Sequence, residues 1–326
     1  MIRALLALLF GAVAVVAAVP AHSTEKGAAE KISVGVIGGM NAFTWPASIA
    51  DAKGLYAKHG VAPEIIFMPS SPGMLQQLAA GSLDIAASAG LVDPVRLVAR
   101  KAGIAIGRVS LRVSPYEVVA KPELHSIADL KGRKVGIGSR DNITYALIID
   151  MLAPFKLKPD DVELMYSGST VSRYAALKTG AYDATMLALP LSFVAESEGF
   201  RNLGIAGDYS KDMPFTGSVI NRAWAGAHLA AAKNFFAAED EATDWFYDEA
   251  HRAEAIAILA KAAKSRPDEA ARSYDFLRSG NYFDRTHKLS RRGVAALVTA
   301  LHELGDKDVE VTAEQAVIPG LTAVGD

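Results

Sequence analysis

The chain of 326 residues contains no cysteine. This absence excludes disulfide bonds, thiolate metal sites and cysteine nucleophiles, and it also excludes a lipid-modified cysteine behind an export signal. Charge of either sign is not in excess, with 34 basic residues against 36 acidic ones, and no long basic run occurs. Such a chain lacks the electrostatic footprint of proteins that bind nucleic acid or anionic membranes. We therefore expect a soluble globular protein that binds neither.

Motifs of catalysis are missing as well. The seven histidines are scattered, with no His-Glu-x-x-His pattern and no pair at metal-ligand spacing on one helix face. No Gly-x-Ser-x-Gly motif occurs. Gly136-Ile137-Gly138 begins a dinucleotide-like fingerprint, but Asp141 stands in place of its third glycine. We expect no catalytic residue, no metal and no cofactor.

Only one long apolar run is present, over residues 4–19, and Arg3 precedes it. A basic residue, an apolar run and the small residues of Val19–Ala21 are typical of a secretory signal peptide. The run is shorter than the roughly 20 residues that span a bilayer. We expect residues 1–21 to be a signal peptide cut after Ala21, and residues 22–31 to be a disordered lead-in.

Two stretches of the chain are nearly the same. Residues 64–86 align without a gap with residues 163–185, so that Glu64, Ser70, Leu78, Gly81 and Asp84 fall on Glu163, Ser169, Leu177, Gly180 and Asp183. Each copy has the pattern strand, turn, helix, turn, strand. Two similar α/β halves in one chain usually face each other across a cleft. The repeat therefore predicts two lobes with a ligand site between them.

The order of elements supports an α/β fold. Short apolar runs predict strands at 32–37, 65–68, 85–87, 104–113, 134–137, 162–166 and 184–187. Apolar periodicity and capping residues predict helices at 45–59, 74–80, 91–100, 142–155 and 172–178. Strands that alternate with helices imply parallel sheets with helices on both faces.

The pattern changes after residue 227. Helices are expected at 227–238, 242–264, 267–277 and 290–304, with at most one strand, at 309–311. We expect this helical tail to pack on the first lobe. The chain would leave that lobe near Val113–Tyr116 and return near Phe215–Asn221, and two crossings make a hinge. The expected units are lobe 1 (32–114), lobe 2 (115–214), and the return to lobe 1 with the C-terminal helices (215–326).

Several phrases resemble the periplasmic solute-binding proteins of ABC importers, specifically the nitrate, sulfonate and thiamine-precursor group. They are Lys53–Val61 (KGLYAKHGV), Leu78–Ala86 (LAAGSLDIA), Asp129–Gly136 (DLKGRKVG) and Ala176–Ala184 (ALKTGAYDA). The resemblance spans roughly residues 31–221. It implies a type 2 periplasmic-binding-protein fold, in which two Rossmann-like lobes are joined by a two-crossing hinge. The phrases are specific as a set, and they leave the ligand open.

The resemblance implies a protein that captures a small organic solute between two closing lobes. The solute would be acidic or aromatic and heterocyclic, and the closed form would be presented to an ABC permease in the inner membrane. Without a lipid anchor such a component needs an enclosed compartment, so we expect a monomer in the Gram-negative periplasm. One alternative is a ligand-sensing partner of a membrane receptor kinase. Another is an enzyme similar to the thiamine-pyrimidine synthases, which depend on a cysteine-rich motif that this chain lacks.

The ligand of an open α/β sheet lies beyond the carboxyl ends of the strands, near helix N-termini. The loops at these places offer hydroxyl, amide, aromatic and guanidinium groups, and Tyr145 adds a further ring. The candidate binding residues are Met40, Asn41, Phe43, Trp45, Ser70, Ser71, Ser88, Tyr116, Arg140, Asn142, Thr144, Ser167, Ser169 and Pro190.

Four of these candidates have a structural alternative. Arg140 follows a strand, where a guanidinium can clamp a carboxylate or sulfonate through two parallel hydrogen bonds. It can equally pair with Asp141 or remain a solvated loop charge. Ser70 and Ser169 can cap helices, which is compatible with ligand binding. Trp45 can belong to the core instead of stacking on a planar solute.

Overall fold

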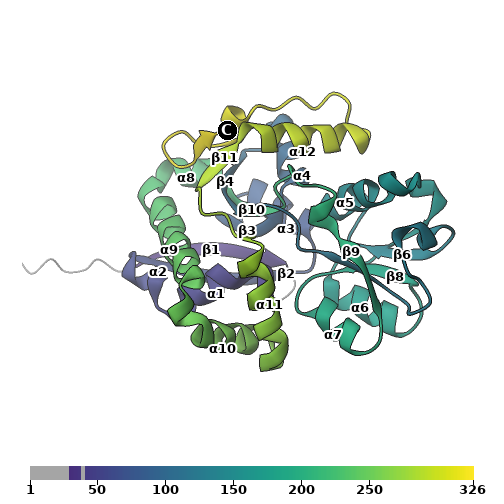
Figure 1. Cartoon of the computed structure of the whole chain (residues 1–326). Coiled ribbons are helices and arrows are strands. Elements are labelled where there is room, and N and C mark those ends of the chain that lie inside the picture. Colours follow the sequence, from purple (N-terminus) through teal and green to yellow (C-terminus); the bar gives the residue numbers. More distant parts are fainter. Residues whose placement is uncertain (1–28, 38–40) are drawn as a thin grey trace, which may run out of the picture.

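The computed structural model describes residues 29–37 and 41–326. Two five-stranded sheets lie side by side within this part of the chain (Figure 1), and we call the parts built around them lobe 1 and lobe 2. The predicted signal peptide, most of the lead-in and Met40 lie outside the described residues. Among the described residues, no helix has both the length and the apolar composition that a membrane crossing requires.

The two sheets have the same plan. The strand order in lobe 1 is β2 (Val61–Met68), β1 (Glu30–Ile37), β3 (Ile85–Gly90), β10 (Thr216–Asn221) and β4 (Ile104–Leu111). In lobe 2 it is β7 (Glu163–Tyr166), β6 (Lys134–Ile137), β8 (Ala184–Leu187), β5 (Glu117–Ala120) and β9 (Arg201–Ile205). A third, two-stranded sheet joins β11 (Lys288–Ser290) and β12 (Ala323–Gly325) in parallel.

Both main sheets are mixed, so the prediction of parallel sheets was wrong in part. β1, β2 and β3 are parallel, as are β6, β7 and β8. β10 is antiparallel to its neighbours β3 and β4, and β5 is antiparallel to β8 and β9. β5 and β10 are the strands that the chain forms directly after it crosses between the lobes. A strand that enters from the other lobe arrives from the opposite end of the sheet, which explains the reversal.

The repeat seen in the sequence is also a repeat of hydrogen bonds. In lobe 1 the Asp84 carboxylate accepts the backbone N–H of Ser33 at 2.7 Å, and in lobe 2 the Asp183 carboxylate accepts that of Lys134 at 3.0 Å. The preceding turn glycines, Gly81 and Gly180, have φ of +78° and +76°, a region that favours glycine. The shared residues thus fix the same strand entry in both lobes.

Helices cover both sheets. Around lobe 1 they are α1 (Trp45–Ala52), α2 (Leu55–Lys58), α3 (Ser71–Ala79) and α4 (Val92–Ala99), and around lobe 2 they are α5 (Ile143–Leu152), α6 (Thr170–Lys178) and α7 (Leu191–Ser197). The predicted helix 45–59 is therefore divided in two. Gly54 has φ of +66° and interrupts it.

The tail forms α8 (Arg222–Ala227), α9 (Leu229–Tyr247), α10 (Arg252–Ala263), α11 (Pro267–Ser279), α12 (Arg291–Glu303) and α13 (Ala313–Ala316). The predicted break near residue 240 does not exist, because α9 continues to Tyr247. Its acidic run is held by Arg108, and the chain turns only at Asp248, which caps the next turn by accepting the N–H of Ala250. Residues 309–311 form no strand.

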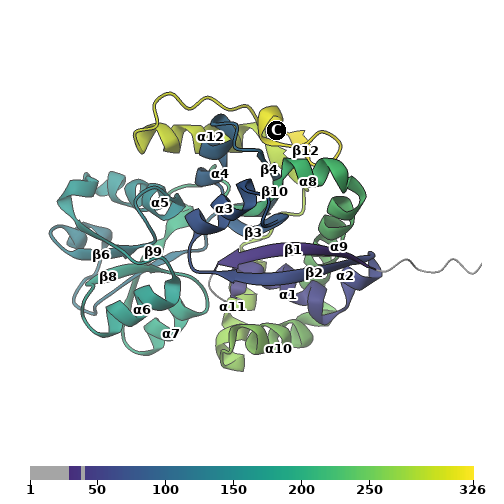
Figure 2. The same cartoon turned by 180° about the vertical axis from the view of Figure 1, so that it is seen from behind.

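The tail packs on lobe 1, as predicted. Figures 1 and 2 show α8 to α11 wrapped around that lobe from both sides. Trp45 of α1 is fully buried, with its ring edge-on to Phe246 of α9 and Tyr274 of α11. The predicted lobe boundaries fall in the two connections β4–β5 and β9–β10, at residues 112–116 and 206–215.

Candidate functional site

A cavity of about 490 Å³ lies where the two lobes meet. Its walls come from residues at the carboxyl ends of β1 and β3 in lobe 1, and from the loops after β6, β7 and β8 in lobe 2. This is the place at which open α/β sheets bind ligands. The volume falls in the range of sites for small molecules, roughly 300–1,000 Å³.

Three of the α-helices that begin at the cavity have a side-chain cap at their start. Ser70 accepts the N–H of Gly73 at the start of α3, Asn142 that of Thr144 at the start of α5, and Ser169 that of Ser172 at the start of α6. The N-terminal N–H groups of a helix favour a negative charge nearby. The capping role expected for Ser70 and Ser169 is confirmed, and both residues also line the cavity.

Three aromatic rings form part of the cavity wall next to the inter-lobe connections. Phe43, Tyr116 and Phe215 contact one another edge to face, with ring centroids 5.2–5.5 Å apart. Tyr116 lies in the first connection between the lobes, and Phe215 lies in the second. The wall therefore includes residues at both places where backbone rotation would close or open the lobes.

Arg173 of α6 lines the cavity although its side chain is only 1% exposed. Its Nε donates to the carbonyl of Met186 at 2.8 Å, and Nη1 donates to the carbonyls of Ser167 and Gly168 at 3.1 and 3.0 Å. Nη2 has only the distant hydroxyl of Tyr116, at 3.5 Å. No carboxylate in the described part of the chain pairs with this guanidinium. The charge of Arg173 is therefore buried beside the cavity without a counter-ion.

Hydroxyl groups with free hydrogen-bonding capacity also face the cavity. The Oγ1 of Thr216 and the Oγ atoms of Ser71, Ser139 and Ser265 are buried and have no hydrogen-bond partner among the described residues. A buried polar atom without a partner destabilises the fold by about 1–3 kcal/mol. Such atoms are suited to hydrogen bonding with a bound ligand.

Asp93 of α4 is the buried acid of the site. Burial raises the pKa of Asp93 to about 6, against the opposing effect of Arg96. Arg96 Nη1 lies 2.5 Å from the Asp93 carboxylate, and the same nitrogen donates to the backbone carbonyl of Asp141 in lobe 2 at 2.8 Å. Arg96 thus neutralises Asp93 and also connects the two lobes.

Other contacts close the seam between the lobes. Gly90 at the end of β3 faces Ile143 of α5 so closely that a Cβ on Gly90 would lie 2.6 Å from Ile143 Cγ2. On another flank, Arg272 of α11 forms an ion pair with Glu196 of α7, and its guanidinium carbon lies 3.9 Å from the Phe193 ring centroid. The two lobes are therefore in contact with each other around the cavity.

Most of the predicted binding residues line the cavity: Asn41, Phe43, Ser70, Ser71, Ser88, Tyr116, Asn142, Thr144, Ser169 and Pro190. Three do not. Trp45 is buried in the core of lobe 1, as its structural alternative required. Arg140 is exposed to solvent. Ser167 contributes its carbonyl to Arg173 instead of facing the cavity. Met40 lies outside the described residues.

Sequence reasoning missed Arg173, although the repeat contained a signal. Arg173 aligns with Met74 in the first copy, and the Met74 side chain is fully buried in lobe 1. A cation at a position that is core in the other copy is unusual, because a buried charge requires a partner. Among the described residues, no group of three or more histidine, aspartate or glutamate side chains could hold a metal ion.

Comparison with known proteins agrees with this geometry. A family described as NMT1/THI5 like matches residues 44–253. A protein of Brucella abortus (strain 2308) that carries the name "putative binding protein" is 30% identical over 228 residues, 67% of each chain. The periplasmic aliphatic sulphonate binding protein SsuA of Escherichia coli superposes with a TM-score of 0.71 at 20% identity, covering 91% of this chain and 94% of its own.

The periplasmic nitrate-binding protein NrtA of Synechocystis PCC 6803 has a TM-score of 0.64 at 20% identity, over 74% of this chain and 69% of its own. At these identities the two solved structures show the fold alone. They confirm the two-lobed fold that the resemblance predicted.

Proposed function

Since the chain belongs to the NMT1/THI5-like family, we propose that it is a periplasmic solute-binding protein that captures a small organic anion for an ABC importer. The single observation that carries the anionic part is Arg173. A guanidinium buried without a counter-ion costs several kcal/mol in desolvation. An acidic group bound in the cavity would offset this cost, and the N-termini of α3, α5 and α6 favour the same charge.

The position of the cavity supports a mechanism of capture by closure. Lobe 1 contributes the start of α3, and lobe 2 contributes the starts of α5 and α6 with Arg173. A solute can contact both sets of groups only when the lobes are closed, so binding shifts the population toward the closed form. The closed form is then the state that a membrane permease would recognise.

Two other readings of the same fold are weaker. A ligand-sensing partner of a receptor kinase would use the same capture step, so the site does not favour it over transport. For an enzyme, the cavity offers little proton-transfer chemistry. No histidine of the described residues lines it, and its carboxylates, Asp93 and Glu269, each pair with an arginine.

The proposed function can be tested with the exported chain and a panel of organic carboxylates, sulfonates and phosphates, each beside a neutral amide or ester of similar shape. We expect at least one anion to raise the melting temperature, since a ligand at 100 times its Kd stabilises the folded state by about 2.7 kcal/mol. Its neutral analogue should have little effect.

Small-angle X-ray scattering of the same samples should show a smaller radius of gyration with the stabilising anion than without it. A neutral analogue that stabilises as strongly as the anion would contradict anion capture. A tight ligand that leaves the radius of gyration unchanged would contradict closure.

A further inference from the structure

One wall of the cavity comes from the turn between α10 and α11. Ala263, Lys264, Ser265 and Glu269 all line the cavity from this hairpin. Figure 1 shows α10 and α11 meeting on the side of lobe 1 that faces α7 of lobe 2. The family match ends at residue 253, before this turn. The turn is therefore an element of the site that the family match does not cover.

The charges around the cavity do not cancel. Four of its lining residues are ionised acids or bases: Asp93, Arg173, Lys264 and Glu269. Each acid contacts an arginine that also pairs with a second carboxylate. Arg96 lies 2.5 Å from Asp93 and 2.7 Å from Asp306, and Arg266 lies 3.2 Å from Glu269 and 2.8 Å from Asp268. Neither Arg173 nor Lys264 has an ion-pair partner anywhere in residues 29–37 and 41–326. Two positive charges without an ion-pair partner thus line the cavity, the buried one of Arg173 in lobe 2 and the solvent-exposed one of Lys264 in lobe 1.

The backbone conformation at Lys264 favours glycine over lysine, which indicates that the lysine side chain is kept for another reason. Lys264 ends α10 with φ of +52°, in the left-handed region where helices usually end in glycine. Lysine at this position is strained relative to glycine. The neighbouring Ser265 has a buried Oγ that lines the cavity without a hydrogen-bond partner among the described residues. The turn thus presents a cation and an unpaired hydroxyl together.

We propose that the site takes an organic dianion, with one acidic group beside Arg173 in lobe 2 and the second beside Lys264 in lobe 1. The proposal rests on the proposed function and specifies the class of solute. Such a dianion connects the two lobes, because each of its acidic groups interacts with a cation of a different lobe. Lys264 is then the residue that separates a ligand with two acidic groups from a ligand with one.

The test uses matched probes, namely succinate, glutarate, adipate and the three benzenedicarboxylates, each compared with its own monomethyl ester. The ester keeps the length of the molecule and removes one charge. We expect at least one diacid to bind on the order of tenfold more tightly than its monoester by calorimetry. The Lys264→Met variant should reduce this ratio to about one, because the second acidic group loses the charge that it binds.

Lys261→Met is the matched control, since Lys261 is an exposed lysine of the same helix that does not line the cavity. It should keep the diacid preference. Increasing salt should weaken diacid binding to the native protein more than binding to Lys264→Met.

The proposal is overturned if the monoesters bind as tightly as the diacids, if Lys264→Met keeps the preference, or if no diacid binds. Tight binding of a monoester without tight binding of any diacid would contradict the dianion proposal. It would leave the proposed capture of an anion intact.

Discussion

The N–H groups of Arg173 have hydrogen-bond partners, but its positive charge has no counter-ion among the described residues. Three of its contacts are to backbone carbonyls, two in the loop after β7 and one, that of Met186, in β8. Carbonyl dipoles stabilise a guanidinium in part, and a full negative charge nearby stabilises it further. Arg140, in contrast, is exposed on the loop after β6, within electrostatic range of Tyr166 at the sheet edge. The two arginines should therefore differ sharply in their effect on binding.

We expect Arg173→Met to lower the affinity for a stabilising anion by roughly 10- to 100-fold, the effect of losing a hydrogen bond to a charged group. Arg140→Met should stay within about twofold of the native protein, because surface charges contribute little. Isothermal calorimetry measures both. Arg173→Lys, which keeps the charge, separates loss of charge from loss of the loop contacts. An equal loss in Arg173→Met and Arg140→Met would contradict this assignment.

The sequence was informative at this scale where a residue has a local partner. Ser70 and Ser169 follow strands and precede helices, and their capping bonds form as the pattern predicts. The side chain of Arg173 reaches from a helix to backbone carbonyls of its own lobe and borders a cavity that both lobes line. Local pattern holds no information on that cavity, and only the comparison with Met74 in the other copy could have indicated it.

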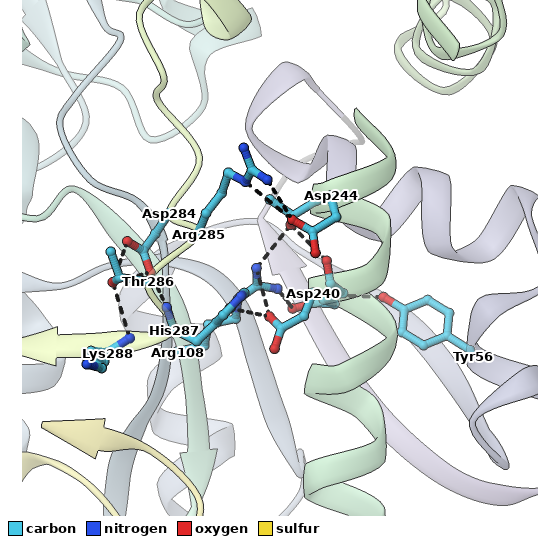
Figure 3. A network of polar contacts seen from close by, with 11 residues as sticks. Tyr56, Arg108, Asp240, Asp244, Asp284, Arg285, Thr286, His287 and Lys288 are labelled. Carbon is cyan, nitrogen blue, oxygen red and sulfur yellow. Dashed lines mark hydrogen bonds and ion pairs between the residues drawn. The ribbon is translucent and has the colours of Figure 1, made fainter. Parts of the chain in front are cut away.

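Among the elements, α9 is tied to β4 by a buried polar network (Figure 3). Arg108 of β4 lies 3.5 Å from the Glu239 carboxylate and 3.0 Å from that of Asp240. Tyr56 donates to Glu239 at 3.4 Å, and His287 lies 2.9 Å from Asp240. Burial raises the pKa of Glu239 to about 7, against the lowering effect of Arg108. Glu239 should therefore make the stability of this packing depend on pH.

The sign of this dependence follows from proton binding. Below about pH 4.5 Glu239 is protonated in the folded and unfolded states alike, and above pH 7 it is ionised in both. In between, only the folded state holds the proton, so the free energy of unfolding falls as pH rises. We expect a fall on the order of 3 kcal/mol from this group, and none of it in Glu239→Gln.

Urea unfolding of both proteins from pH 4 to 8 measures the effect as a difference between two curves. Burial also raises the pKa of Asp93. Asp93 is present in both proteins, so its contribution cancels in the difference between the two curves. Parallel curves over this range would show that Glu239 titrates alike in the folded and unfolded states.

Most elements with a strong local pattern could be predicted, and two kinds could not. The strands β6 and β8 lie at the predicted residues. The end of α9 was misplaced because the acidic run around residue 240 resembles a solvated turn until Arg108, distant in sequence, is brought against it. The antiparallel β5 and β10 were missed as sheet partners because their direction depends on the crossing between lobes.

For the whole molecule, closure is limited by contacts at the seam. Gly90 and Ile143 come from different lobes, and no room remains between them for a methyl group. We expect Gly90→Ala to keep the lobes from closing fully and to lower ligand affinity on the order of tenfold, since the competent closed state becomes less populated. The unliganded protein should keep its melting temperature, because each lobe is intact.

Calorimetry gives the affinity, and the scattering radius of the liganded protein should exceed that of the native complex. Gly226→Ala in α8 is the control, since its added Cβ would meet nothing within 4 Å and should leave binding unchanged. Native affinity together with a native radius in Gly90→Ala would show that Ile143 yields to the methyl group without opening the seam.

The place of β10 in the sheet also sets an order of assembly. β10 lies between β3 and β4, yet it follows every strand of lobe 2 along the chain. All five strands of lobe 2 fall within residues 117–205, whereas lobe 1 cannot complete its sheet until residue 221 has been synthesised. Domains fold as units while a chain grows. Lobe 2 is thus the first unit that the growing chain can finish, and β3 and β4 must wait as unpaired edges until β10 emerges.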